Sequence, residues 1–210
     1  MDPQSTYDRI ATHFSKTRKY AWPEVETFLA GRAAERGLDV GCGNGRHTEL
    51  LADHAPRCLG VDLSRELLRE AASRASERGF DDRAAFVHGD AARLPVSTDA
   101  VDLAVYVATI HHLSPRAARL RSLNELARVL RSDGVALVSA WSTAHDRFDR
   151  DEGFDTAVDW TLPGGETVPR YYHIYDPAEF DADLADSDLT VVDVSVSSGN
   201  CYGVVRAPDA

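Results

Sequence analysis

The feature that most constrains this chain is a short apolar segment that runs into three glycines at alternate positions. Residues 38–40 precede the sequence Gly-Cys-Gly-Asn-Gly, and a helix-like pattern begins near His47. Glycine is needed where the backbone takes a positive φ, or where a ligand approaches too closely for a Cβ. The pattern therefore predicts a buried strand, a tight turn and a helix start, the place in an α/β sheet where ligands bind.

The spacing of these glycines distinguishes the turn from a dinucleotide fingerprint. That fingerprint is G-x-G-x-x-G, whereas this chain has G-x-G-x-G preceded by an acidic residue. The order resembles motif I of the class I S-adenosylmethionine-dependent methyltransferases; a plain strand-to-helix turn is the alternative. The cofactor contacts that this resemblance implies are Asp39, Gly41, Cys42, Gly43, Asn44 and Gly45.

Two later carboxylates strengthen the prediction of a nucleoside site. Asp62 ends a second apolar segment, 21 residues after Gly41, and is followed by Leu63. A carboxylate at such a position can accept hydrogen bonds from ribose hydroxyls. Asp90 ends a third apolar segment, and in the methyltransferases the matching pair, here Asp90 and Ala91, contacts adenine. Isolated aspartates are usually solvated, but three ligand-type positions, the glycine turn, Asp62 and Asp90, each at the end of an apolar strand, favour a ligand site.

Composition narrows the class of protein. The chain has 210 residues, no secretory leader and no apolar run long enough to span a membrane, which predicts a soluble cytoplasmic protein. Its three cysteines show no paired spacing, so neither a disulfide framework nor a metal site is expected. A net charge of −11, with Lys16 and Lys19 the only lysines, is typical of salt-loving organisms. Molar salt shortens the Debye length to about 3 Å, so this acidity does not exclude an RNA substrate.

Strand-like and helix-like segments alternate along most of the chain, which predicts an α/β fold with a doubly wound, mostly parallel sheet. The apolar run at 101–107 is expected at its centre, and Ser5 is the expected cap of a first helix. Residues 142–169 lack a clear period and are expected to form a long, mobile loop on the substrate side. We expect one methyltransferase domain: a helical cap (1–34), a cofactor-binding core (35–141), an insertion (142–176), and a C-terminal helix and hairpin (177–210).

Several blocks resemble one subgroup, the tRNA wobble-uridine carboxymethyl methyltransferases, found also as a domain of an AlkB-homologue tRNA enzyme. The blocks are residues 7–15, 18–23, 38–46, 110–114, 119–130, 170–173 and 200–202. Cys201 departs from the tryptophan usual in that subgroup, and the acidic insertion differs from the basic loops expected for tRNA contact. The resemblance implies a seven-stranded sheet and S-adenosylmethionine as cofactor. It also implies methyl transfer to the carboxylate of 5-carboxymethyluridine in tRNA, which forms an ester.

Three residues are candidates for holding the acceptor. A carboxylate is already deprotonated at neutral pH, so the reaction needs no general base. Arg170 matches a planar carboxylate bidentately, although it could instead pair with a nearby acid such as Asp176 or Glu179. His111 and His112 follow the fourth strand. Either they contact the acceptor, or one packs in the core and the other is exposed to solvent.

Partners and alternatives follow from the same resemblance. The basic residues Lys16, Arg18 and Lys19 are expected to face a tRNA substrate. The subgroup also works with a small zinc-binding activator protein, which would add strands beside the third strand, around residues 84–87. The alternatives are a class I methyltransferase with a small-molecule acceptor and a non-catalytic scaffold. Retained ligand carboxylates, Asp62 and Asp90, disfavour the scaffold.

Overall fold

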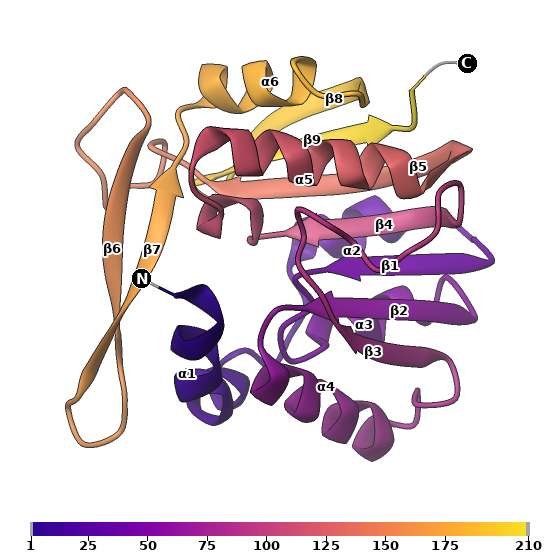
Figure 1. Ribbon diagram of the computed structural model, residues 1–210, viewed down its shortest axis with the longest axis horizontal. Coiled ribbons are helices and arrows are strands. Elements are labelled where there is room, and N and C mark those ends of the chain that lie inside the picture. The colour runs from indigo at the N-terminus through magenta and orange to yellow at the C-terminus, as the bar shows by residue number, and fades with distance from the viewer. Residues whose placement is uncertain (1, 209–210) are drawn as a thin grey trace.

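A computed structural model describes residues 2–208 of the chain. A central sheet of seven strands has the order β3-β2-β1-β4-β5-β9-β8, in which β9 runs opposite to the other six strands (Figure 1). The expectation of a doubly wound, mostly parallel sheet of seven strands is confirmed. The strands are β1 (Arg36–Val40), β2 (Arg57–Asp62), β3 (Ala84–His88), β4 (Val101–Val107), β5 (Leu130–Trp141), β8 (Thr190–Ser197) and β9 (Asn200–Arg206).

Helices cover both faces of this sheet. One face packs against α5 (Arg116–Val129) and α6 (Pro177–Ala185), through a cluster that includes Leu123 and Phe180. The other face packs against α2 (Pro23–Leu29), α3 (Arg46–Leu51) and α4 (Arg65–Arg78), whose cluster includes Phe28 and Leu51. Both helix layers are visible in Figure 1. The sheet is therefore buried on both sides, as a mostly parallel sheet requires.

Strand β4 lies at the centre of the sheet, as its apolar sequence predicts. Ala104 and Tyr106 belong to the cluster on the α5 side, whereas Leu103 and Val105 belong to the cluster on the α2 side. Successive side chains of a strand point to opposite faces, so the buried part of a central strand has to be apolar on both faces. That requirement explains the apolar run at 103–107, whereas Asp102, near the start of the strand, pairs with Arg131.

The N-terminal helix α1 (Pro3–Thr17) begins earlier than expected. Asp2, and not Ser5, is the capping residue: its carboxylate accepts hydrogen bonds from the backbone N–H groups of Gln4 and Ser5. Pro3 suits the first helical position because its missing N–H would have no helical partner there. The helix packs against α4 and β7, and not on a face of the sheet.

The expected mobile loop at 142–169 is wrong in its second half. Strands β6 (Phe154–Thr161) and β7 (Thr167–Ile174) form a two-stranded antiparallel sheet. It lies with α1 on the side of the molecule where the parallel strands end (Figure 1). Val158 and Trp160 are buried while Asp159 between them is exposed, so buried and exposed side chains alternate as in a strand, but only over a few residues. Only the complete hairpin shows which face of these strands is covered.

Helix α3 ends at Leu51, and β5 begins at Leu130, directly after α5. A single 3₁₀ turn, η1 (Ile110–His112), follows β4. Among residues 2–208, no helix has the length and apolar character needed to cross a bilayer.

Candidate functional site

The glycine turn after β1 leaves room for a ligand against the backbone. Gly41 has φ = 69° and Gly43 has φ = 54°, both in the left-handed region that favours glycine. A Cβ on Gly41 would collide with Thr109, whereas a Cβ on Gly43 would meet only Phe14, at 3.7 Å. Gly41 is thus required by the fold, and Gly43 opens the backbone toward free space.

That free space is a cavity of about 840 Å³ between the ends of the parallel strands, α1 and the hairpin. This volume lies within the range of small-molecule and cofactor sites. Eight of the ten predicted cofactor residues line it: Gly41, Cys42, Gly43, Asn44, Asp62, Leu63, Asp90 and Ala91.

The other two predicted cofactor residues lie outside the cavity lining. Asp39 is buried behind the turn, and its carboxylate accepts a hydrogen bond from Thr48 Oγ1 at 2.6 Å. Burial raises the pKa of Asp39 to about 7, because the surroundings disfavour its charged form. Gly45 caps α3 in the left-handed conformation and packs on Ala71. Both residues therefore shape the turn from behind.

Asp62 both supports the turn and faces the cavity. One carboxylate oxygen accepts the N–H of Gly43 at 2.8 Å, and the other accepts the N–H of Ser64 at 2.7 Å. Burial raises the pKa of Asp62, although these backbone N–H groups oppose that shift. Each carboxylate oxygen can accept a second hydrogen bond, so the group keeps acceptor capacity for a ligand.

Asp90 and Asn44 differ in how free they are to contact a ligand. Asp90 is exposed at the cavity rim, where one oxygen accepts the N–H of Ala92 at 2.8 Å. Asn44 is buried, and its amide donates to the carbonyl of Arg18 at 2.9 Å. Asn44 thus ties the glycine turn to the segment that follows α1.

The two histidines of η1 lie side by side, with ring centroids 4.4 Å apart, and both line the cavity. His111 Nδ1 accepts the backbone N–H of Trp141 at 3.0 Å, so the ring proton is on Nε2. His112 Nδ1 donates to the carbonyl of Tyr171, and His112 Nε2 accepts from the hydroxyl of Tyr7. Burial lowers the pKa of both rings, that of His112 to about 4, so both are neutral at physiological pH.

Arg170 is buried, with 7% of its surface exposed, and lines the same cavity. Its Nη1 donates to the hydroxyl of Tyr172 at 2.7 Å, its guanidinium lies over the Trp160 ring, and its Nε has no partner. No carboxylate pairs with it among residues 2–208. An arginine does not give up its proton, so this site holds a buried positive charge that lacks a counter-ion.

The predicted alternative partners of Arg170 bond elsewhere. Asp176 caps α6 by accepting the N–H of Glu179, and Glu179 itself pairs with Arg119 and His173. The alternative of a surface arginine paired with one of these acids is wrong. The guanidinium is instead available to an anion in the cavity.

Aromatic side chains that the sequence does not predict as site residues surround Arg170. Tyr7 of α1, Trp141 of β5, Trp160 of β6 and Tyr172 of β7 all line the cavity. Single aromatic residues carry no local signal for this role, because apolar packing gives the same pattern. Arg18 also lines the cavity and lies over the Phe14 and Trp160 rings, whereas Lys16 and Lys19 are exposed. Of the three basic residues expected to face the tRNA, one therefore lines the cavity and two lie on the surface.

Together the turn, the strand-end carboxylates and the parallel sheet define a class I methyltransferase fold. A sequence model of the family described as Methyltransferase domain matches residues 38–138. A putative methyltransferase of Encephalitozoon cuniculi is 31% identical over 95% of this chain and 92% of its own. The chain belongs to this methyltransferase family.

More specific relatives act on tRNA. The tRNA (carboxymethyluridine(34)-5-O)-methyltransferases of Saccharomyces cerevisiae and Arabidopsis thaliana are 33% and 34% identical over 78% and 67% of this chain. The chain spans 58% and 32% of their lengths. The predicted resemblance to the wobble-uridine enzymes is confirmed.

Solved structures agree on the fold. The CcbJ methyltransferase of Streptomyces caelestis has a TM-score of 0.79 at 19% identity, covering 99% of this chain and 100% of its own. A chain from the complex between the Haloferax volcanii Trm112 activator and a putative methyltransferase has a TM-score of 0.74 at 16% identity, covering 100% and 99%.

Proposed function

We propose that this protein transfers a methyl group from S-adenosylmethionine to the carboxylate of 5-carboxymethyluridine at the wobble position of tRNA. One observation carries the proposal: the buried, unpaired guanidinium of Arg170 shares a cavity with the glycine turn and the strand-end carboxylates. An acceptor that is itself a carboxylate would supply the missing counter-charge.

The cofactor side of the cavity suits S-adenosylmethionine. The free space beside Gly43 admits a ligand against the backbone, Asp62 has acceptor capacity for ribose hydroxyls, and the free oxygen of Asp90 can accept an amino hydrogen of adenine. Asp39 and Gly45 act indirectly, by holding the turn in shape. When bound, the cofactor supplies an electrophilic methyl group on a positively charged sulfur.

The acceptor side holds and orients the carboxylate. A carboxylate oxygen forms the new bond to the methyl carbon while the carbon–sulfur bond breaks and its electron pair stays on sulfur. The products are a methyl ester and neutral S-adenosylhomocysteine, and no proton is transferred. Arg170 would fix the attacking oxygen through two N–H groups, and proximity and alignment would account for most of the acceleration.

The two histidines have different proposed roles. His111 carries its proton on Nε2, and that N–H has no partner among the described residues, so it can donate to the acceptor. His112 bonds to Tyr7 and to the Tyr171 carbonyl, so it positions α1 against β7. Neither needs to act as a base, because the nucleophile is already ionised.

The proposed partners are tRNA and an activator protein. The exposed lysines 16 and 19 lie on the segment that borders the cavity, and residues 142–176 would cover the acceptor. Within residues 2–208, strand β3 pairs only with β2, which leaves one edge open for added strands. A structural relative was solved in a complex with the Trm112 activator, which supports an activator as partner. A small zinc-binding activator and a cytoplasmic location complete the proposal.

The test is methylation of tRNA that carries carboxymethyluridine, followed by mass spectrometry of the digested nucleosides. Arg170→Lys keeps the charge and loses the bidentate geometry, so turnover should fall about 10–100-fold, as expected for losing a charged hydrogen bond. Calorimetry should show unchanged binding of S-adenosylmethionine. Arg131→Lys, which alters a surface arginine paired with Asp102, is the control and should keep full turnover. Wild-type turnover in Arg170→Lys would contradict the role of Arg170, and absence of ester in the wild type would contradict the proposed function.

A further inference from the structure

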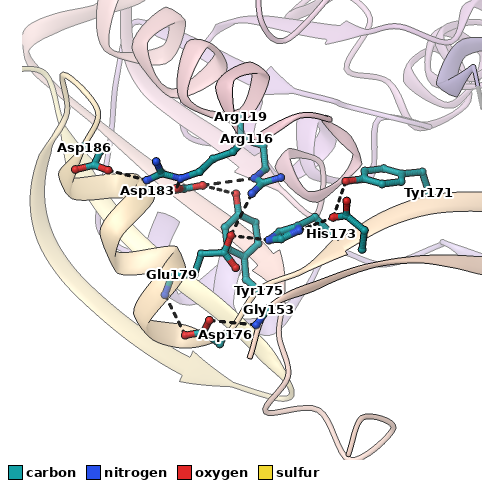
Figure 2. Close-up of polar contacts among 11 residues, drawn as sticks. Arg116, Arg119, Gly153, Tyr171, His173, Tyr175, Asp176, Glu179, Asp183 and Asp186 are labelled. Carbon is teal, nitrogen blue, oxygen red and sulfur yellow. Dashed lines mark hydrogen bonds and ion pairs between the residues drawn. The ribbon is translucent and has the colours of Figure 1, made fainter. Parts of the chain in front are cut away.

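Strand β7 presents different chemistry on its two faces. Arg170 and Tyr172 face the cavity, whereas His173 and Tyr175 take part in a polar network with α5 and α6. Figure 2 shows this network, in which His173 and Tyr175 extend toward α5 and α6. A shift of one residue in β7 would exchange the faces, which would carry Arg170 out of the cavity. By holding the register of β7, the network on the opposite face keeps Arg170 in the cavity.

His173 is the centre of that network. Its Nδ1 lies 2.7 Å from Asp155 Oδ1 of β6, and its Nε2 lies 2.8 Å from Glu179 Oε1 of α6. A neutral imidazole can donate from only one nitrogen, so two ionised carboxylates require a ring that is protonated on both. Glu179 also accepts a hydrogen bond from Arg119, at 3.1 Å.

The network continues into the core of the domain. The buried pair Arg119 and Asp183 is linked at 3.5 Å, and the hydroxyl of Tyr175 donates to Asp183 at 2.9 Å. Arg116 joins Asp183 at 2.6 Å, from the surface end of α5 (Figure 2). His173 thus connects the hairpin, through Glu179, to residues that are anchored in two helices.

We propose that protonated His173 is a positioning residue for the acceptor: by bridging Asp155 and Glu179 it holds the β6–β7 hairpin in register and so directs Arg170 into the cavity. The inference rests on the proposed function only for the identity of the acceptor. The bridge and its effect on the hairpin are properties of the protein alone.

The bridge should respond to pH. Burial alone would lower the pKa of His173, but the hydrogen bonds to Glu179 and Asp155 outweigh it and raise the pKa, while the nearby charge of Arg119 opposes them. A raised pKa means that the bridge is complete below the ordinary histidine value near 6.5 and is lost as pH rises through the folded-state pKa. Tyr171 of β7 and Tyr175, which directly follows the strand, are the other titratable groups near this ring. They remain neutral in that range because burial raises the pKa of each.

The first experiment measures hydrogen exchange in the hairpin as a function of pH, with no acceptor present. In the wild type, exchange of the β7 amides relative to those of β4 should accelerate as pH rises through the pKa of His173. In His173→Gln the β7 amides should exchange about tenfold faster already at pH 6, and the extra pH dependence should disappear. Asp155→Asn removes one carboxylate from an exposed position, so it should lower the pKa of His173 and shift the transition to lower pH.

The control is His54→Gln, at a histidine that bonds the Arg32 carbonyl and does not line the cavity; it should exchange like the wild type. The second experiment is a double-mutant cycle on the Michaelis constant for the tRNA. His173→Gln should raise that constant about tenfold in the wild-type background and should have little effect in Arg170→Lys, while binding of S-adenosylmethionine stays unchanged in all.

Unchanged exchange in His173→Gln, or equal effects of this change in both backgrounds, would overturn the proposal. If the wild type forms no ester, the proposed function fails, and the exchange experiment alone decides on the bridge: faster β7 exchange in His173→Gln supports it, and unchanged exchange refutes it.

Discussion

At the scale of single residues, Asp62 has two roles: it stabilises the glycine turn and it faces the ligand cavity. Its carboxylate accepts the N–H groups of Gly43 and Ser64, and it also lines the cavity. A change to alanine would therefore remove loop hydrogen bonds together with a ligand contact, so a loss of affinity in that variant would have two causes. Asparagine keeps one acceptor oxygen and nearly the same shape, which makes it the better probe.

We expect Asp62→Asn to bind S-adenosylmethionine about 10–100-fold more weakly, because charged hydrogen bonds contribute ~1.5–3 kcal/mol. Isothermal titration calorimetry gives the affinity, and thermal unfolding shows whether the turn is intact. Asp102→Asn is the matched control: Asp102 also accepts two backbone N–H groups, those of Glu35 and Arg36, but it does not line the cavity. Equal affinity in Asp62→Asn and the wild type would exclude Asp62 from the cofactor site.

At the scale of elements, the two edges of the sheet differ in what surrounds them. Strand β3 forms one edge and packs against α4, and its Val87 is 37% exposed. Strand β8 forms the other edge, with Val192 51% exposed. Open edges invite pairing with further strands unless charges or bends prevent it. Both edges expose apolar side chains, so this property alone does not show which edge binds a partner. We propose that the activator binds the β3 edge.

Val87→Lys should abolish complex formation with a Trm112-type activator, because a lysine on an edge strand disfavours strand addition. Val192→Lys makes the same change on the opposite edge and should leave the complex intact. Co-expression followed by size-exclusion chromatography measures both. The edge assignment fails if Val192→Lys prevents the complex or if Val87→Lys does not.

At the scale of the whole molecule, charge is unevenly distributed. The net charge is −11, yet the only two lysines, Lys16 and Lys19, are exposed next to the cavity. Arg18 between them is held over aromatic rings and serves the cavity wall. An acidic protein that binds RNA must concentrate its cations locally, because phosphate contacts supply most of the sequence-independent affinity.

Replacing Lys16 and Lys19 together with serine should weaken tRNA binding while leaving cofactor affinity unchanged. Each lost phosphate contact should reduce the slope of log affinity against log salt by up to about one. Filter binding at several salt concentrations measures the slope. Arg36 and Arg57 are exposed at the N-terminal ends of β1 and β2, away from the cavity; replacing them with serine removes the same charge and should not change the slope. The same slope in both double variants would contradict a tRNA surface at the lysines.

The sequence by itself determined the glycine turn, the central strand and the carboxylates that follow the strands. These features are local: glycine tolerates positive φ, a doubly covered strand must be apolar throughout, and parallel strands end at one edge. The alternation of β6 is also present in the sequence. Its exposed face carries acidic residues, however, and its other face is buried only once β6 has paired with β7, so the sequence alone does not predict the strand.

Only the tertiary structure decided which polar groups are paired. Tyr7, His112 and the Tyr171 carbonyl form one hydrogen-bonded chain from three distant segments, and Arg170 is left without a carboxylate although acids follow it closely in sequence. Such pairings depend on strand register and helix docking, which bring together residues far apart along the chain. For that reason, the residue types indicated methyl transfer, whereas the candidate carboxylate site became visible only once the hairpin was placed against the sheet.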